Sequence, residues 1–187
     1  SFVVCYGFSE IIHHLTQGKN MNRTLLLLSL LAISSVGCSA TIKNKLIDWE
    51  GFEKIVSKKN IIREKKRLTE RQFIQAMKEE GVILLDARSK KNYDLRHIVG
   101  AVNLPFTEVT AESLRKVIPE KNSKILIYCN NNFLNSPVSF ASKKAPASLN
   151  VFTQVNLSAY GYENVFELGP LLDVRTTKIP FAGTECK

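Results

Sequence analysis

Cys129 is the residue of this chain whose setting most favours chemistry. It ends an apolar run that starts at Lys124, and three asparagines, Asn130, Asn131 and Asn132, follow it directly. A hydrophobic strand that ends at a cysteine presents the thiol at the carboxyl edge of a sheet, where open α/β folds bind ligands. A turn of backbone N–H groups at that edge can hold sulfur as the reactive thiolate. The sequence therefore predicts a nucleophilic thiol, with an ordinary buried cysteine beside a polar turn as the alternative.

A second group of polar residues follows another apolar run. Asp86 and Arg88 come after residues 82–85 and stand two positions apart, so their side chains point to the same side. We expect them to pair and to tie the loop that carries His97 to the edge of the sheet. His97 precedes Gly100 and is expected to form a local hydrogen bond. Substrate contact for the pair and a general-base role for His97 are the alternatives.

The sequence predicts neither a metal nor a cofactor. No group of Cys, His and Asp has the spacing of metal ligands, and no Gly-rich phosphate loop or Gly-x-Ser-x-Gly elbow occurs. His13, His14 and Cys5 lie before the first methionine, Met21, so we do not expect them to take part in function.

The elements that must position these residues alternate between helix and strand. Thr69 and Gln72 have the spacing of a capping box, which predicts a helix from there to about Glu80. Helices are also expected over 90–95, 111–117 and 150–160, and strands over 82–85, 101–104, 125–128 and 164–168. This alternation is typical of an α/β fold. We predict a single domain with a small, mostly parallel sheet flanked by helices.

The N-terminal part carries the pattern of an export signal. A basic start at 21–23 is followed by an apolar run over 24–34 and by small residues before Cys38. The pattern resembles a bacterial lipoprotein signal, which implies cleavage before Cys38, lipid on its sulfur and a periplasmic, membrane-anchored protein, with the outer membrane as the expected anchor. Because Ser35 stands where that signal usually has leucine, a secreted product without lipid stays open, as does a buried core helix.

These patterns divide the chain into consecutive segments. The predicted segments are an upstream or mis-set start at 1–20, a signal peptide at 21–37, a tether and lead-in at 38–68 with a helix near 49–56, the α/β domain at 69–175 and a tail at 176–187. The lead-in holds much of the formal net charge of +9, between Lys54 and Arg71. Attraction to an anionic membrane surface is one interpretation and a solvated helix face is the other. Nucleic-acid binding is not predicted, because no aromatic residues interleave the charges.

Several short motifs, taken in order, resemble the signature of a rhodanese-like domain. They are Leu84–Arg88, Tyr93, His97–Pro105, Ile127–Cys129 and Gly161–Leu168, and together they span roughly Thr69 to Asp173. The resemblance implies a cysteine that carries sulfur as a persulfide between a sulfur donor and a thiol or protein acceptor. It places catalysis at Cys129 and a substrate-binding loop at Asn130, Asn131, Asn132, Phe133 and Leu134.

The loop after Cys129 departs from the pattern of active family members. They have a glycine and an arginine in a compact loop, whereas residues 130–142 contain no Gly, Arg or Lys. We therefore expect dianionic thiosulfate to be a poor substrate and a neutral or peptide-borne persulfide to be a better one. Asn135 stands where related phosphatases have arginine, which argues against phosphatase activity. The connection to Gly161 is also longer than usual, which leaves open whether a helix N-terminus points at the sulfur.

Three functions are compatible with these residues. The leading one is an envelope sulfurtransferase or persulfide carrier that uses Cys129. The second is a catalytically inactive binding module whose 130–150 segment forms a recognition surface. The third is thiol–disulfide chemistry between Cys129 and Cys186, although the chain has no Cys-x-x-Cys motif.

Overall fold

The structure of the protein is a computed structural model, and it describes residue 42 and residues 44–186. The predicted upstream segment, the predicted signal peptide and Cys38 lie outside the described residues. Within the described part, no helix has the length and apolarity of a membrane span.

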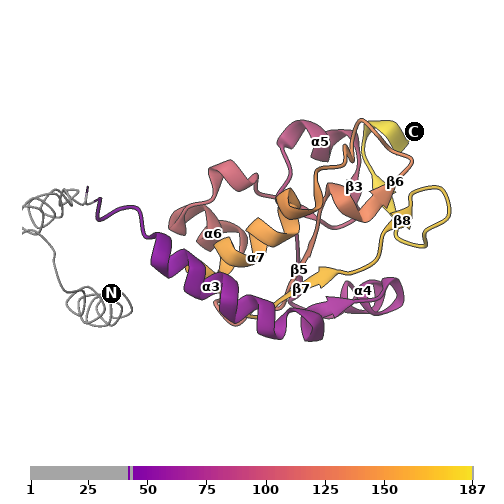
Figure 1. The fold of residues 1–187 in the computed structure, drawn as a ribbon. Coiled ribbons are helices and arrows are strands. Elements are labelled where there is room, and N and C mark those ends of the chain that lie inside the picture. Colours follow the sequence, from indigo (N-terminus) through magenta and orange to yellow (C-terminus); the bar gives the residue numbers. More distant parts are fainter. Residues whose placement is uncertain (1–41, 43, 187) are drawn as a thin grey trace, which may run out of the picture. The chain divides into compact units, whose positions relative to one another are not determined.

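A sheet of five parallel strands forms the centre of the domain (Figure 1). Its order is β1 (Arg67–Leu68), β7 (Val165–Leu168), β5 (Ile125–Tyr128), β2 (Ile83–Asp86) and β4 (Val102–Asn103). Two smaller pairings join β3 (His97–Ile98) to β9 (Phe181–Ala182) and β6 (Phe133–Leu134) to β8 (Leu172–Asp173). The predicted α/β class with a mostly parallel sheet is confirmed.

Helices flank this sheet. They are α3 (Trp49–Ile62), α4 (Glu70–Ala76), α5 (Lys90–Leu95), α6 (Ala111–Val117) and α7 (Leu149–Ala159), with short 3-10 turns η2 (Arg63–Lys66), η3 (Phe106–Glu108), η4 (Asn130–Asn132), η5 (Ala145–Ala147) and η6 (Thr184–Cys186). Thr69 and Gln72 form the predicted capping box of α4. That helix ends at Ala76, well before Glu80, because the chain tightens there into turn hydrogen bonds from the N–H groups of Lys78 and Glu79.

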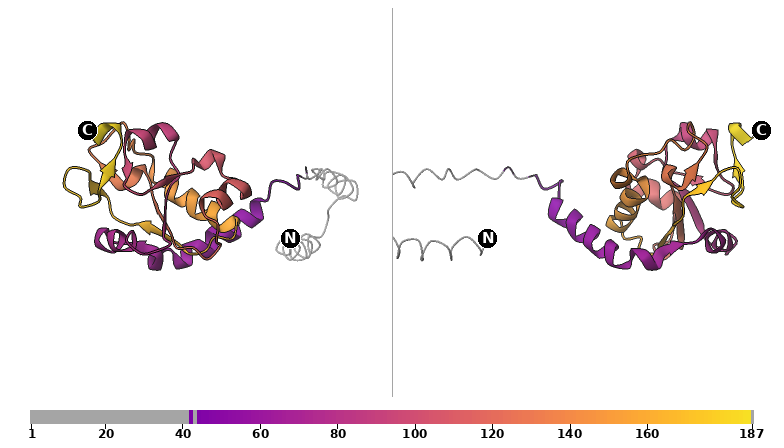
Figure 2. Two further views of the ribbon diagram at one scale, coloured as in Figure 1. Left: turned by 180° about the vertical axis from the view of Figure 1, so that it is seen from behind. Right: turned by 45° about the vertical axis from the view of Figure 1, so that its right-hand side comes forward.

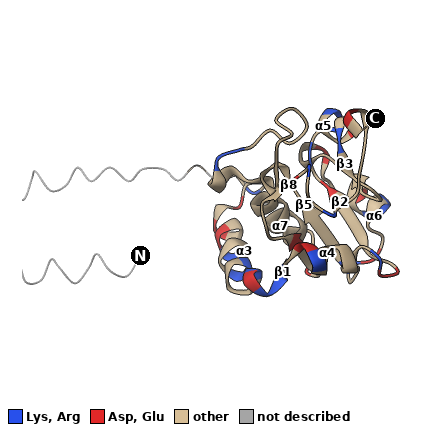
Figure 3. Ribbon diagram, turned by 90° about the vertical axis from the view of Figure 1, so that its right-hand side faces the viewer, with Lys and Arg blue, Asp and Glu red and all other residues tan. Residues whose placement is uncertain are grey.

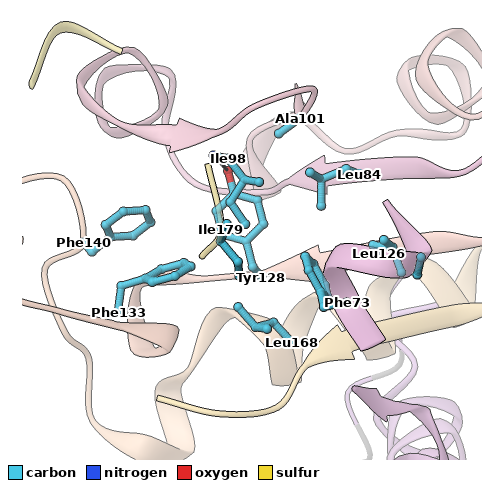
Figure 4. Packing of buried hydrophobic residues seen from close by; sticks show 11 residues of the cluster. Phe73, Leu84, Ile98, Ala101, Leu126, Tyr128, Phe133, Phe140, Leu168 and Ile179 are labelled. Carbon is cyan, nitrogen blue, oxygen red and sulfur yellow. Dashed lines mark hydrogen bonds between the residues drawn. The ribbon is translucent and has the colours of Figure 1, made fainter. Parts of the chain in front are cut away.

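Strand β5 shows how the sheet divides the core. Ile125 and Ile127 pack on the face covered by α6 and α7, while Leu126 and Tyr128 pack on the face covered by α4 (Figure 4). Successive side chains of a strand point to opposite faces, so a strand covered on both sides is apolar throughout. The strand is therefore rigidly held, and it delivers Cys129 to the carboxyl edge of the sheet.

Helix α3 lies along α7, as the views in Figures 1 and 2 agree. Its Lys and Arg positions, blue in the ribbon of Figure 3, are followed by further ones in η2 and β1. Lys58 and Lys59 form ion pairs with Glu163, and Arg63 and Arg67 form ion pairs with Glu167. Part of the basic cluster is thus turned into the domain, which neither the membrane nor the solvated-face interpretation anticipated.

Candidate functional site

Cys129 follows β5 directly and is only 1% exposed, but it lines a pocket of about 360 Å³ at the carboxyl edge of the sheet. The other walls come from four parts of the chain. They include Arg63 of η2, Asn131 and Asn132 of η4, Ser148 and Asn150 at the start of α7, and Glu167 of β7. The thiol is therefore deeply set yet borders a polar space, and is not enclosed by hydrocarbon alone.

Two polar groups contact the Cys129 sulfur. The backbone N–H of Asn132 faces Sγ while it donates to the Cys129 carbonyl oxygen at 3.2 Å, and the Oγ of Ser148 lies 3.4 Å from Sγ. Ser148 is the N-cap residue of α7, and its side chain forms no capping hydrogen bond within that helix. The crossover helix thus begins long after the loop, but its first residues come back to the sulfur. The partial positive charge of a helix N-terminus favours negative charge at this position.

Asn132 holds the loop in place. Its Oδ1 accepts hydrogen bonds from the Cys129 N–H at 2.9 Å and from Asn150 Nδ2 at 3.2 Å. Its Nδ2 donates to the carbonyl oxygens of Leu168 at 2.8 Å and Pro170 at 3.2 Å. One buried amide therefore ties η4 to the start of α7 and to the end of β7.

The predicted substrate loop divides into residues that reach the pocket and residues that do not. Asn131 and Asn132 line it, and Asn131 is clamped to Lys143 by two hydrogen bonds of 2.8 and 2.9 Å. Asn130 is buried and Phe133 packs into the core against aromatic rings, whereas Leu134 is 45% exposed. None of these last three lines the pocket, because the strand β6 directs Phe133 and Leu134 to opposite sides, away from the sulfur.

Asp86 and Arg88 form the expected pair, with Arg88 Nε 2.9 Å from Asp86 Oδ1. Arg88 also donates from Nη1 to the carbonyl oxygen of Ser139 at 2.8 Å and from Nη2 to that of Arg96 at 2.7 Å. The hydroxyl of Tyr128 donates to Asp86, and burial together with this carboxylate raises the pKa of Tyr128 well above its ordinary value. The pair thus fastens the segment after Cys129 and the residue before His97 to the end of β2.

The His97 side chain contacts Tyr93, four residues before it in the chain. Its Nδ1 lies 2.7 Å from the carbonyl oxygen of Tyr93, and its ring stacks on the Tyr93 ring at 3.8 Å. Neither His97 nor the Asp86–Arg88 pair lines the Cys129 pocket. The structure places all three where they support loops.

Arg63 and Glu167 are the charged pocket residues that sequence reasoning missed, and it also missed Ser148 and Asn150. Glu167 is 1% exposed, and its Oε1 lies 2.9 Å from Arg63 Nη2 and 3.5 Å from Arg67 Nε. Burial raises the pKa of Glu167, although the two guanidinium groups oppose this. Glu167 pairs in register with Ile127, so it points to the same side of the sheet as Ile127 and, two residues on, Cys129.

A signal for Glu167 was present in the sequence. It is a charged residue inside the apolar strand Val165–Leu168, and a buried carboxylate is costly enough to call for an explanation. Arg63 gave no such signal, because it stands among many cations of the lead-in segment. The packing of α3 against α7 brings it to the pocket that Cys129 lines.

Two further predictions concern metal binding and the pairing of Cys129 with Cys186. Among residues 44–186, no group of three His, Cys, Asp or Glu side chains is placed to hold a metal ion. Cys129 is a buried free thiol and Cys186, in η6, is an exposed one, so the structure contains no bridge between them.

Comparison with known proteins identifies relatives of the segment that carries this site. The Rhodanese-like domain family matches residues 69–169. The thiosulfate sulfurtransferase PspE of Escherichia coli K12 is 28% identical over 95 residues, which span 51% of this chain and 76% of PspE. An uncharacterized protein of Buchnera aphidicola is 26% identical over 72 residues, which span 38% of this chain and 49% of that protein.

Two solved structures are similar as well. The rhodanese-like domain of an Anabaena protein has a TM-score of 0.48 at 19% identity, covering 65% of this chain and 82% of that domain. A rhodanese from E. coli has a TM-score of 0.35 at 23% identity, covering 55% of this chain and 98% of that one. The segment matched by the family includes Cys129 and Glu167 but begins after Arg63.

Proposed function

We propose that this chain, which belongs to the rhodanese-like domain family, transfers sulfane sulfur through Cys129 as a sulfurtransferase or persulfide carrier. The observation that carries the proposal is the setting of the sulfur. The Asn132 N–H and the Ser148 hydroxyl face Sγ at the N-terminus of α7, on a pocket large enough for a small substrate. The partial identity with a protein named a thiosulfate sulfurtransferase adds support.

The reaction proceeds in two nucleophilic steps. The Cys129 thiolate attacks the outer sulfur of a sulfane donor, the donor's sulfur–sulfur bond breaks, and the rest of the donor leaves with that bond's electron pair. A Cys129 persulfide remains. An acceptor thiolate then attacks the outer sulfur of the persulfide, forms a new sulfur–sulfur bond and releases the Cys129 thiolate.

The charges around the pocket select among donors. The loop itself has no cation, and the Arg63 guanidinium is paired with Glu167. A dianion such as thiosulfate therefore meets a carboxylate and little uncompensated positive charge. We expect neutral or peptide-borne persulfides to be better donors than thiosulfate.

Cyanolysis tests the proposal. The wild-type protein, loaded with a persulfide donor and then treated with cyanide, should release thiocyanate in proportion to protein. Cys129→Ser should release none, and Cys186→Ser should match the wild type because Cys186 is exposed and remote from the pocket lining. Absence of thiocyanate from the folded wild type with every donor would refute the proposal.

The second candidate function is a catalytically inactive binding module. The observations that favour it are the 1% exposure of Cys129 and the absence of an arginine from its loop. The two candidates differ in thiol access. If the native protein reacts with a small alkylating agent at Cys186 but not at Cys129, the binding module is favoured; modification of Cys129 as well favours sulfur transfer.

We further propose that the protein acts in the periplasm, held to the bacterial envelope by lipid on Cys38. The lipoprotein-like signal in the sequence supports this location. Its test is metabolic labelling with a radioactive fatty acid in a bacterial host. Label should enter the wild type and be lost in Cys38→Ala, and an unlabelled wild type would contradict the anchor.

A further inference from the structure

Unsatisfied polar groups gather around the pocket beside Cys129. Among the described residues, Glu167 Oε2, Asn150 Oδ1 and Arg63 Nε are buried atoms that have no hydrogen-bond partner, while Glu167 Oε1 is held by its ion pairs with Arg63 and Arg67. Asn150 is 5% exposed and Glu167 is 1% exposed, and all three residues line the Cys129 pocket. Buried polar atoms are normally paired, so a cluster of unpaired ones from η2, α7 and β7 points to a ligand.

The chemistry of these atoms defines what would satisfy them. Glu167 and Asn150 offer hydrogen-bond acceptors, and the Glu167 carboxylate also carries a negative charge. Arg63 offers a donor with positive charge. The complement is a small molecule that carries an ammonium group and a carboxylate, close to a sulfur that can reach Cys129.

We propose that Arg63, Glu167 and Asn150 form a subsite for the α-ammonium and α-carboxylate groups of an amino-acid thiol such as cysteine, which accepts the sulfur carried by Cys129. This inference rests on the proposed function and names the acceptor for it. The ammonium group lies against Glu167 and Asn150 Oδ1, and the carboxylate lies against Arg63.

The size and charge of the pocket agree with a zwitterion. Its volume of about 360 Å³ is in the range of small-molecule sites, roughly 300–1,000 Å³. A zwitterion leaves the charge of the Arg63–Glu167 pair balanced, whereas a simple anion would add a second negative charge beside Glu167. When the ligand binds, Arg63 and Glu167 each give up part of their contact with one another. Each then contacts the oppositely charged group of the ligand.

The transfer step balances without a further reactant. The incoming thiol gives its proton to solvent and attacks the outer sulfur of the Cys129 persulfide as a thiolate. The Cys129 sulfur–sulfur bond breaks, and its electron pair returns to Sγ. The products are a persulfide of the amino acid and the free Cys129 thiolate, and no electrons leave the pair of reactants.

The position of Arg63 shows how this specificity arises. It belongs to η2, which precedes the segment matched by the family at residues 69–169. The family segment supplies the sulfur carrier, while the lead-in helix α3 brings the cation that the loop after Cys129 lacks. Substrate choice is thus added by a segment outside the shared domain.

Binding of inert analogues to the wild-type protein tests the subsite. Isothermal titration calorimetry would compare S-methyl-L-cysteine with 3-(methylthio)propionate, which lacks the ammonium group, and with 2-(methylthio)ethylamine, which lacks the carboxylate. Each truncated analogue should bind about tenfold or more weakly than S-methyl-L-cysteine, since each leaves a charged hydrogen-bonding group unpaired. Equal binding of all three, or no binding of any, would overturn the proposal.

Variants assign the two ends of the ligand. Glu167→Gln should weaken S-methyl-L-cysteine about tenfold and leave 3-(methylthio)propionate unchanged, and Arg63→Gln should weaken S-methyl-L-cysteine and leave 2-(methylthio)ethylamine unchanged. Arg67→Gln is the matched control, because Arg67 also lies beside Glu167 but does not line the pocket. It should bind all three analogues as the wild type does, and a loss equal to that in Arg63→Gln would contradict the assignment.

The two proposals fail in different ways. If S-methyl-L-cysteine is selected but no persulfide forms on Cys129, the subsite stands and the sulfur-transfer function fails. If persulfide forms and passes equally well to cysteine and to 2-mercaptoethanol, the function stands and the subsite fails.

Discussion

Two arginine–carboxylate pairs lie near the carboxyl edge of the sheet, and they differ in how completely they are satisfied. In the Asp86–Arg88 pair, the guanidinium also reaches two backbone carbonyl oxygens and the carboxylate also accepts from Tyr128. In the Arg63–Glu167 pair, Arg63 Nε and Glu167 Oε2 lack hydrogen-bond partners within the described part of the chain, and Glu167 Oε1 has only its ion pairs with Arg63 and Arg67. Groups of the protein itself satisfy the first pair, whereas we propose that a ligand satisfies the second.

The difference indicates that the Asp86–Arg88 pair supports the structure and that the Arg63–Glu167 pair is suited to binding a ligand. A saturated buried network fixes the loops around it and gains nothing from a further molecule. An unsaturated one costs stability in the empty protein and gains most when a matching ligand arrives. Arginine–carboxylate pairs at the same sheet edge therefore have different roles, and variants of the two pairs should behave differently.

Arg88→Met should cause the largest loss of stability. It leaves the Asp86 charge buried without its partner, which costs about 3–5 kcal/mol of unfolding free energy. Urea unfolding followed by circular dichroism measures the change. Arg175→Met is the control, because that ion pair is exposed and should leave the midpoint unchanged; an equally small effect at Arg88 would remove the distinction between the pairs.

Asn132→Ala should have an intermediate effect. It removes the acceptor of the Cys129 and Asn150 hydrogen bonds and the donor to two carbonyl oxygens, so we expect a loss of about 1–3 kcal/mol. Urea unfolding measures this loss. Asn131→Ala, which breaks only the clamp to Lys143, should cost less, and the reverse order would show that Asn132 is not the centre of the loop.

Arg63→Gln should cost less stability than Arg88→Met. The Arg63 side chain is 40% exposed, and Arg67 still lies 3.5 Å from the Glu167 carboxylate in this variant, so the buried charge keeps one partner. The measurement is again urea unfolding, beside Arg88→Met. A loss as large as that of Arg88→Met would show that the Arg63–Glu167 pair is structural, contrary to the comparison.

Two glutamates should give small pH effects of opposite sign. Burial opposes the ionisation of Glu163, but hydrogen bonds from Lys59, Lys58 and Ser158 lower its pKa to about 2. Its contribution is complete above the ordinary value of 4.5 and is lost as the pH falls from there toward 2. Burial raises the pKa of Glu167, so its contribution falls as the pH rises above 4.5.

Unfolding free energies at a series of pH values measure both effects. Glu163→Gln should reduce the loss of stability in acid, and Glu167→Gln should reduce the loss above pH 4.5. For each variant, the difference in unfolding free energy from the wild type is followed as a function of pH. Slopes of the same sign for the two variants would contradict the opposite environments assigned to these residues.

The sequence was sufficient to single out Cys129 and insufficient for the rest of the pocket. Helices α5 and α6 and strand β5 begin and end where their patterns predict, because caps, charges and continuous apolar runs are local signals. Cys129 and the Asp86–Arg88 pair could be found in the same way. The return of Ser148 to the sulfur could not, because it depends on the path of a long connection.

The partner of Arg63 was missed for a similar reason. Arg63 stands among lysines and arginines on a helix, and charge patterns of this kind are usually solvated. Its contact with Glu167 exists because α3 packs along α7, which is a tertiary event. Phe133 and Leu134 were assigned to the substrate loop by resemblance, but strand β6 carries one into the core and the other to the surface.

Intact-protein mass spectrometry after incubation with a low-molecular-weight persulfide tests the central claim most directly. The account predicts a mass increase of one sulfur atom that maps to Cys129, persists in Cys186→Ser and is absent from Cys129→Ser. A folded wild-type protein whose Cys129 gains no sulfur under these conditions would contradict it.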